Sequence, residues 1–205
     1  MVELNEENNA AKNMTRHFVS NYLPYLLLLT VIIGAIFVLY YQGRIWWCKW
    51  DTPVQIWSND AWGTHNSQHL FDPYSFTHIL HGLGFYGILY LIFRRKIPLA
   101  WLLLIAVSAE SAWEVLENSK FVIERYRAAT VSLEYFGDSI ANSFGDVLCC
   151  VTGFLVAHKL GLRRSLALFV LTEIVLIFWI QDSLLINILM LVYPIEWIKT
   201  WQTGG

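Results

Sequence analysis

The sequence has few charged residues and few cysteines. Only 15% of its 205 residues are Asp, Glu, Lys or Arg, and the formal net charge is -2, which excludes the basic surface that nucleic-acid binding needs. Cys48 lies in a loop, whereas Cys149 and Cys150 are neighbours in an apolar run, so they predict neither a disulfide framework nor a CxxC metal site. The chain also lacks a P-loop, a dinucleotide-binding glycine motif and a motif for a covalent Ser or Cys nucleophile.

Apolar residues are abundant instead. They make up 56% of the chain, and the mean hydropathy of +0.46 is too high for a soluble domain. Five apolar runs are long enough to cross a bilayer. These are residues 22–41, 74–93, 97–118, 137–159 and 165–181. We therefore predict an all-α, polytopic membrane helix bundle with about five transmembrane helices in one domain, residues 22–205.

The remaining segments are assigned from their charge and polarity. Residues 1–21 are polar and predict a flexible cytoplasmic N-terminus, followed by an uncleaved signal anchor. Basic residues before the first run, between the second and third, and between the fourth and fifth fall on one side, which predicts the cytoplasm. They are Lys12, Arg16, Arg94, Arg95, Lys96, Lys159, Arg163 and Arg164. The outer loops, residues 42–73 and 119–136, and the C-terminus are then periplasmic.

The chain after residue 181 also indicates a membrane interface. Asp182 and Ser183 interrupt an apolar run, so we expect the fifth helix to end there. An amphipathic interfacial helix should follow, with Trp197 and Trp201 as anchors at the level of the headgroups.

Polar side chains occur at helical spacing within three of the five predicted spans. A lone ionised side chain at the bilayer centre costs about 2.5 to 3.5 kcal/mol even on the lenient insertion scale, so these groups require partners. They are His78 and His81, then Glu110, Glu114 and Glu117, then Asp138, Asn142 and Asp146. Counting about 1.5 Å per residue from the outer side places His81, Glu110 and Asp146 in one layer, roughly 10 to 13 Å deep. His78, Glu114 and Asn142 form a second layer nearer the surface, with Glu117 and Asp138 at the rim.

Imidazoles together with carboxylates are typical ligands of a divalent metal. We predict a metal held by His78, His81, Glu110 and Asp146, with zinc as the first choice and iron or manganese as alternatives. His65 and His69, four residues apart, are expected to add outer ligands if their loop turns helical. In the pocket expected among these three helices, we predict catalytic roles for Glu114 as general base or acid, and for Asn142 and Glu117. Outside it, Arg125 and Arg127, with Tyr126 between them, are predicted to bind a phosphate or carboxylate of the substrate.

Each of these signals also has a simpler structural explanation. Two histidines three residues apart are common helix-packing residues, and a glutamate ladder also suits a proton or ion path. Asp138 is a candidate helix N-cap, Asp72 a turn residue, and Glu173 a packing or hydrogen-bonded residue. Gly82, Gly84 and Gly87 are expected to bring the second and third spans into close contact. The shared depth of the polar residues favours a functional site.

Four stretches carry a resemblance to a known family. They are THNSQHLFDPYSFTHILHG, ESAWEVLEN, RYRAATVSLEYFGDSIANSFGD and QDSLLINILMLVYPIEWIKTWQ. From about Gly43 onward the chain resembles an uncharacterised family of bacterial multipass inner-membrane proteins, catalogued as domain of unknown function 2585, and it is distantly similar to VanZ-like membrane proteins. The resemblance implies the bacterial inner membrane but brings no activity. Gln181 and Ser183 stand where the family pattern has Arg and Asn. This difference weakens the case for a charged functional group at residues 181–183.

Three functions are compatible with this pattern. The leading hypothesis is a metal-dependent intramembrane hydrolase or group transferase that acts on a lipid or lipid-linked substrate from the periplasmic side. The second is a metal-ion or proton transport or binding protein, and the third is a structural or assembly subunit of a membrane complex. A homo-oligomer is compatible with all three. Residues 88–93, 99–106 and 147–157 contain no Asp, Glu, His, Lys or Arg, so the polar tract should be closed at the cytoplasmic end. A closed tract favours a site over a channel.

Overall fold

The structure is a computed structural model that describes residues 19, 22–49, 53, 55–94, 96–130 and 133–204. These residues contain eight α-helices and one isolated β-bridge, between Trp57 and Phe71. The predicted all-α architecture is therefore confirmed. The prediction of a flexible N-terminus concerns residues 1–21, which lie outside the described residues except for Val19.

Four of the helices are long and apolar enough to cross a membrane. They are α2 (Leu23–Tyr41), α3 (Ser75–Phe93), α4 (Leu99–Glu117) and α6 (Ile140–Leu160). The fifth predicted span corresponds to α7 (Leu162–Ile180), which meets the same criterion only together with α8 (Leu184–Val192), across a bend of 73°. The chain is thus a membrane protein with four straight candidate spans and one broken one.

The bend between α7 and α8 is held by side chains on both sides of it. Gln181 adopts a left-handed conformation with φ of 53°, and the Ser183 side chain accepts a hydrogen bond from the backbone of Ile186. Glu173 of α7 is buried, and its carboxylate accepts hydrogen bonds from the backbone N–H of Leu184 and Leu185. These contacts satisfy the first backbone donors of α8, so the predicted break after residue 181 is stabilised by Glu173.

Two shorter helices complete the fold, α5 (Lys120–Ala129) and α9 (Glu196–Gln202). The outer loop predicted at residues 119–136 is therefore partly helical. Ser119 caps α5 by accepting a hydrogen bond from the backbone of Val122, and Val122, Ile123 and Tyr126 are buried on one face. The sequence pattern missed α5 because ten residues give only three turns of periodicity.

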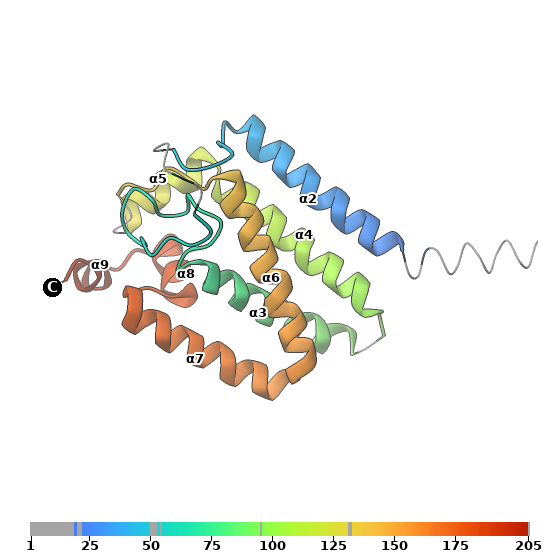
Figure 1. Ribbon diagram of the computed structural model, residues 1–205. Helices are drawn as coiled ribbons and strands as arrows, with labels where there is room; N and C mark the ends of the chain where they lie inside the picture. Colours follow the sequence, from blue (N-terminus) through green and yellow to red (C-terminus); the bar gives the residue numbers. More distant parts are fainter. Residues whose placement is uncertain are drawn as a thin grey trace, which may run out of the picture.

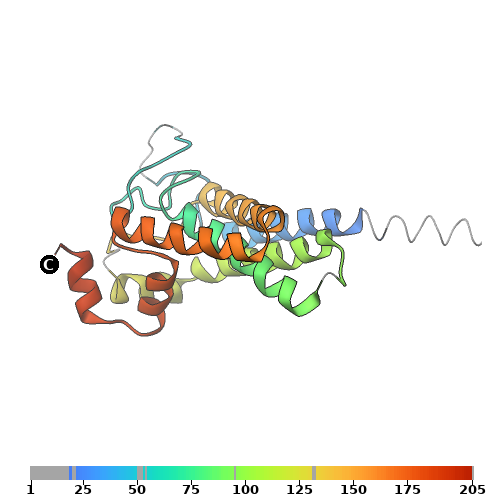
Figure 2. The same ribbon diagram turned by 90° about the horizontal axis from the view of Figure 1, so that it is seen from below.

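The helices form a bundle with a cap at one end (Figure 1). The cap consists of the described residues of the loop 42–73 together with α5, α8 and α9, and Figure 2 shows the same grouping from below. The turns between α3 and α4 and between α6 and α7 lie at the opposite end (Figure 1). The outer ends of α3, α4 and α6 therefore meet beneath the cap, where the polar residues were expected.

The half of the bundle away from the cap is filled by apolar side chains. Leu83, Tyr86, Leu102, Ala106 and Phe154 belong to one buried cluster contributed by α3, α4 and α6. Tight packing of this kind leaves no polar path through the core that these residues form.

Glycines allow α3 to approach α6 closely. A Cβ on Gly82 would lie 2.0 Å from the carbonyl oxygen of Cys150, and a Cβ on Gly153 would lie 2.1 Å from that of Ile79. The prediction that Gly82, Gly84 and Gly87 join α3 to α4 was wrong. Among the described residues, Gly84 has no neighbour within 4 Å of its ideal Cβ, and Gly87 faces Leu162 of α7. A short connection fixes only which helix ends are near each other, whereas small residues decide which faces touch.

We predict that Gly82→Ala strongly destabilises the protein, since the added methyl group meets a backbone carbonyl that cannot rotate away. The expected loss is about 3 kcal/mol in the free energy of unfolding, measured by thermal unfolding in detergent micelles. The matched control is Gly84→Ala on the same helix, which should be neutral or slightly stabilising. Equal unfolding temperatures for the two variants would contradict the close α3–α6 contact.

Candidate metal and acid–base site

The two histidines of the site lie on the first turns of α3, just after a tightly held turn. Asp72 accepts backbone hydrogen bonds from Ser67 at 2.9 Å and from Tyr74 at 2.8 Å. Burial raises the pKa of Asp72 to about 7, although these backbone N–H groups oppose the shift. The structural role predicted for Asp72 fits this geometry, because the turn sets where α3 begins and so where His78 and His81 point.

Glu110 of α4 lies between the two imidazoles. Its Oε1 atom is 2.6 Å from Nδ1 of His78, and its Oε2 atom is 2.9 Å from Nδ1 of His81. Glu110 is fully buried, at 0% exposure. A carboxylate that accepts from both Nδ1 atoms leaves both Nε2 atoms as lone-pair donors toward other groups.

Asp146 of α6 completes the convergence of three helices. Its Oδ2 atom lies 3.7 Å from Nε2 of His78, and its Oδ1 atom accepts a hydrogen bond from the Ser75 hydroxyl. The predicted meeting of imidazoles and acids from three spans is therefore present. The predicted layers are not separate, because His78, expected one layer above Glu110, contacts it directly. A stagger of one helical turn is only about 5 Å along the axis, which these side chains span.

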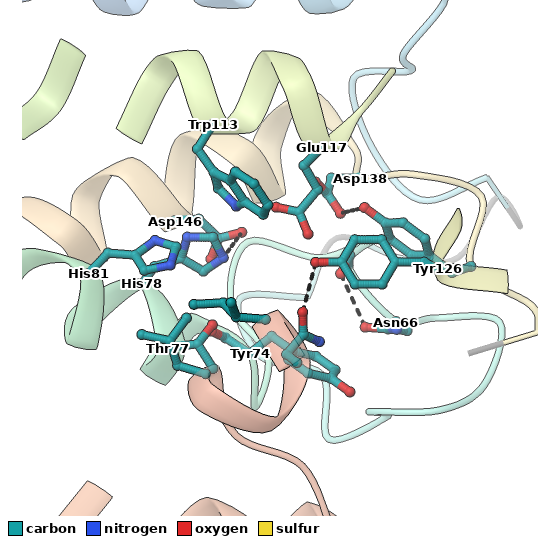
Figure 3. A pocket seen from close by; sticks show the side chains of 15 residues that line it. Asn66, Tyr74, Thr77, His78, His81, Trp113, Glu117, Tyr126, Asp138 and Asp146 are labelled. Carbon is teal, nitrogen blue, oxygen red and sulfur yellow. Dashed lines mark hydrogen bonds and ion pairs between the residues drawn. The ribbon is translucent and has the colours of Figure 1, made fainter. Parts of the chain in front are cut away.

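A cavity of about 140 Å³ adjoins these groups (Figure 3). One wall is polar and ionisable, and the other is apolar and comes from α8. The lining residues are Asn66, Ser67, Tyr74, Thr77, His78, His81, Trp113, Glu117, Tyr126, Tyr135, Asp138, Asp146, Leu184, Asn187 and Ile188. This combination of an apolar wall and a few convergent polar groups is typical of small-molecule sites.

Asp138 lies on this cavity but is not a helix cap. It accepts hydrogen bonds from Asn118 at 2.6 Å and from the Tyr135 hydroxyl at 2.9 Å. Ser139 is the N-cap of α6 instead, because its side chain accepts from the backbone of Asn142. Burial raises the pKa of Asp138, and the hydrogen bonds from Asn118 and Tyr135 oppose that rise.

The three predicted catalytic residues occupy different positions. Glu117 lines the cavity, whereas Glu114 and Asn142 are buried and do not line it. Glu114 Oε1 is 3.4 Å from Nδ1 of His78. Among the described residues, neither oxygen of Glu114 nor the amide nitrogen of Asn142 has a hydrogen-bond partner. Such orphaned buried atoms are rare in folded proteins, and a bound water, a proton or an ion would satisfy them.

Tyr126 points to the cavity, but its two arginine neighbours do not line it. The Tyr126 hydroxyl donates to Asn187 at 2.8 Å, and burial raises its pKa, so the phenol stays protonated. Arg125 donates to the carbonyl of Leu191, and Arg127 to that of Tyr135. Both arginines thus tie parts of the cap together, because Arg125 satisfies a carbonyl in the last turn of α8 and Arg127 satisfies one in the segment before α6.

His65 and His69 lie apart from the cavity. Nδ1 of His65 is 3.4 Å from Cys48 Sγ and 3.4 Å from Nε2 of His69. The segment around them forms turns rather than the helix on which the prediction depended, so they do not line the cavity with His78. Burial lowers the pKa of His69, with the neighbouring His65 as a second cause.

Several cavity residues were not identified from the sequence. Tyr74 and Trp113 had a detectable signal, because Tyr74, His78 and His81 share one helical face, as do Glu110, Trp113 and Glu117. Asn66 comes from an irregular loop, and Asn187 is brought in only by the bend before α8. Local spacing carries no information about either of these two residues.

Comparison with known proteins confirms the family that the sequence motifs resemble. A family model described as "Protein of unknown function (DUF2585)" matches residues 39–204. The chain belongs to this family. It is 42% identical to a UPF0314 protein of Brucella anthropi over 87% of this chain and 90% of the relative. It is 40% identical to a UPF0314 protein of Paracoccus denitrificans over 91% of this chain and 96% of the relative. No solved structure matches the chain.

We predict that Glu110→Ala destabilises the fold, because two buried imidazoles lose their shared acceptor. Removing one partner of a buried, hydrogen-bonded group should lower the free energy of unfolding by about 3 kcal/mol, measured by thermal unfolding in micelles. The matched control is Glu124→Ala on α5, whose carboxylate lies on the surface, 3.7 Å from Lys120. That change should cost less than about 1 kcal/mol. If Glu110→Ala behaved like the control, Glu110 would not hold the histidines.

Proposed function

We propose that this protein is a metal-dependent enzyme of the bacterial inner membrane, a hydrolase or group transferase that acts on a lipid or lipid-linked substrate. One observation carries the proposal. The cavity has two imidazoles and three carboxylates on one wall and the apolar side chains Leu184 and Ile188 on the other. An amphipathic substrate presents this pair of surfaces, a polar headgroup and an acyl chain.

The metal in this proposal is held by the imidazoles of His78 and His81, with Glu110 and Asp146 as the carboxylates beside them. Ligand atoms of His78, His81 and Glu110 lie within 4.8 Å of one another. Two ligands about 2.05 Å from a tetrahedral zinc ion are about 3.3 Å apart, and His78 Nε2 lies 3.7 Å from Asp146 Oδ2. The contacts of Glu110 with the histidines, 2.6 and 2.9 Å, are too short for a shared ion and are hydrogen bonds. Carboxylates that accept from the outer nitrogen of a metal-binding histidine are the rule in such sites.

The nitrogen and oxygen donors suit zinc, with iron or manganese as alternatives. A divalent ion there would act as a Lewis acid and make water a nucleophile at neutral pH. Glu117 is the acid–base group in this scheme because it lines the cavity, whereas Glu114 is buried behind His78. Tyr126 and Asn187, already hydrogen-bonded to each other, are suited to bind the polar headgroup.

The proposed orientation of the protein in the membrane follows from the positions of its Lys and Arg residues. Arg94, Lys96, Lys159, Arg163 and Arg164 lie at or next to the two turns farthest from the cap. Positive residues in short loops favour the cytoplasm, so the cap and the cavity face the periplasm, as does the C-terminus. Trp197 is 69% exposed and Trp46 is 60% exposed on the cap, which suits an interface with lipid headgroups.

Transport of a metal ion or of protons is the alternative use of the same residues. Transport would require a polar path through the other half of the bundle. The buried cluster that includes Leu83, Leu102 and Phe154 occupies that half, which favours a site that opens on one side only.

We predict that the purified protein retains a divalent metal in its cavity. In inductively coupled plasma mass spectrometry, His78→Ala/His81→Ala should contain about one metal equivalent per chain less than the wild type. The control His158→Ala, whose imidazole lies near Tyr86 on the far side of the core, should keep the wild-type content. Equal metal content in the double variant and the control would remove these histidines from the ligand set.

We also predict that Glu117→Gln keeps the metal and loses turnover. The amide preserves the shape of the side chain but cannot exchange a proton, so a fall of 100-fold or more is expected, on the order of a lost general acid or base. The assay is lipid mass spectrometry of vesicles made from total bacterial lipid extract, incubated with the reconstituted protein. If no lipid species changed with the wild-type protein, or if Glu117→Gln matched it, the enzymatic proposal would fail.

A further inference from the structure

A second cluster of metal-binding side chains lies in the cap, outside the cavity. Cys48, His65 and His69 bring one sulfur and two ring nitrogens within 4.8 Å of one another. Cys48 and His69 are buried, at 8% and 1% exposure, and His65 is intermediate. None of the three lines the cavity, and none is used in the proposed reaction.

The separations within the cluster match those between ligands of one zinc ion. Zn–S and Zn–N distances of about 2.3 and 2.05 Å at a tetrahedral angle separate sulfur and nitrogen by about 3.6 Å, and two nitrogens by about 3.3 Å. Cys48 Sγ and His65 Nδ1 are 3.4 Å apart, as are His65 Nδ1 and His69 Nε2. The nitrogen–nitrogen distance exceeds the usual 2.9 to 3.0 Å of a hydrogen bond by about 0.4 Å. The two rings lie nearly parallel, with an interplanar angle of 23°.

The loop holds this geometry by specific local contacts. Asp60 accepts hydrogen bonds from the backbone of Gly63 at 2.6 Å and of His65 at 3.1 Å. A Cβ at Gly63 would lie 2.5 Å from an Asp60 oxygen, so a side chain there would push the Asp60 carboxylate away from these hydrogen bonds. Ser67, between the two histidines, has a left-handed φ of 57°, which is unfavourable for a residue with a side chain. Strained backbone between two candidate ligands is typical of a site that the fold is built to present.

We propose that Cys48, His65 and His69 bind a structural zinc ion that clips the start of the outer loop to the turn before α3. Zinc binding releases the thiol proton of Cys48 to solvent, because the thiolate is the ligand. His65, being partly exposed, leaves the fourth position accessible to water. Asn66 and Ser67 lie between the two histidine ligands and line the cavity, so the clip fixes one part of the cavity wall. The clip does not depend on what reaction the cavity performs.

Cobalt(II) provides the test, since a thiolate ligand gives it a near-ultraviolet charge-transfer band that imidazoles and carboxylates do not give. The full-length protein in micelles is stripped with a chelator and titrated with cobalt. We expect the band in the wild type, in Cys149→Ser, whose thiol lies on α6, and in His78→Ala/His81→Ala. We expect at least a tenfold loss of its intensity in Cys48→Ser and in His69→Ala. Zinc should abolish the band in the wild type by competition.

Each alternative outcome decides against the clip. Absence of the band in the wild type, or its persistence in Cys48→Ser, would show that Cys48 is not a ligand. Its persistence in His69→Ala would remove the histidine from the set. Because His78→Ala/His81→Ala keeps Cys48, the band tests the clip separately from the cavity metal. If Cys48→Ser fails to fold, thiol alkylation of the wild-type protein serves instead, and equal rates for Cys48 with and without zinc would overturn the proposal.

Discussion

The contact of Glu110 with two imidazoles is the constraint around which the rest of the bundle is arranged. A carboxylate at 0% exposure inside an apolar helix bundle is tolerated only where donors reach it, and here both donors come from one turn of α3. That requirement fixes the rotation of α3 about its axis and its height against α4. Gly82 of α3 and Gly153 of α6 then allow the two backbones to come close enough for Asp146 to approach His78.

The cap follows from the same constraint. Polar groups at the outer ends of α3, α4 and α6 have to be covered, and the chain covers them with short elements whose own polar groups are satisfied from neighbours. Glu173 binds the first backbone donors of α8, and Arg125 binds carbonyls at its far end. Tyr74 and Tyr126 donate to Asp182 and Asn187 near the bend. The apolar face of α8 is thus held opposite the ionisable wall of the cavity, although α8 itself is only nine residues long.

The sequence was informative wherever periodicity and burial act together. Runs of about twenty apolar residues located the long helices, and the positions of His81, Glu110 and Asp146 within them predicted that three helices would bring polar groups to one depth. Spacing along one helix cannot tell which neighbour it faces, so Gly82 was assigned to α4 when it contacts α6. The sequence also does not show which of several possible hydrogen-bond partners a side chain binds. Asp138 resembles a helix cap in sequence, but Asn118 and Tyr135 occupy it, and Ser139 caps the helix.

Cys48 shows most clearly what could not be predicted from the sequence alone. Cys48 has no metal-binding neighbour in the sequence, and it was set aside because the chain has no CxxC pattern. Its partners, His65 and His69, are seventeen and more residues away, and only the irregular loop held by Asp60 and Gly63 brings them within reach. Two candidate metal sites of different character result. One is soft, with a thiolate ligand, and shapes the loop, whereas the other has nitrogen and oxygen donors and faces a cavity. Since zinc in structural sites is commonly bound by thiolate and imidazole, the ligands of the clip agree with its place in a loop outside the cavity.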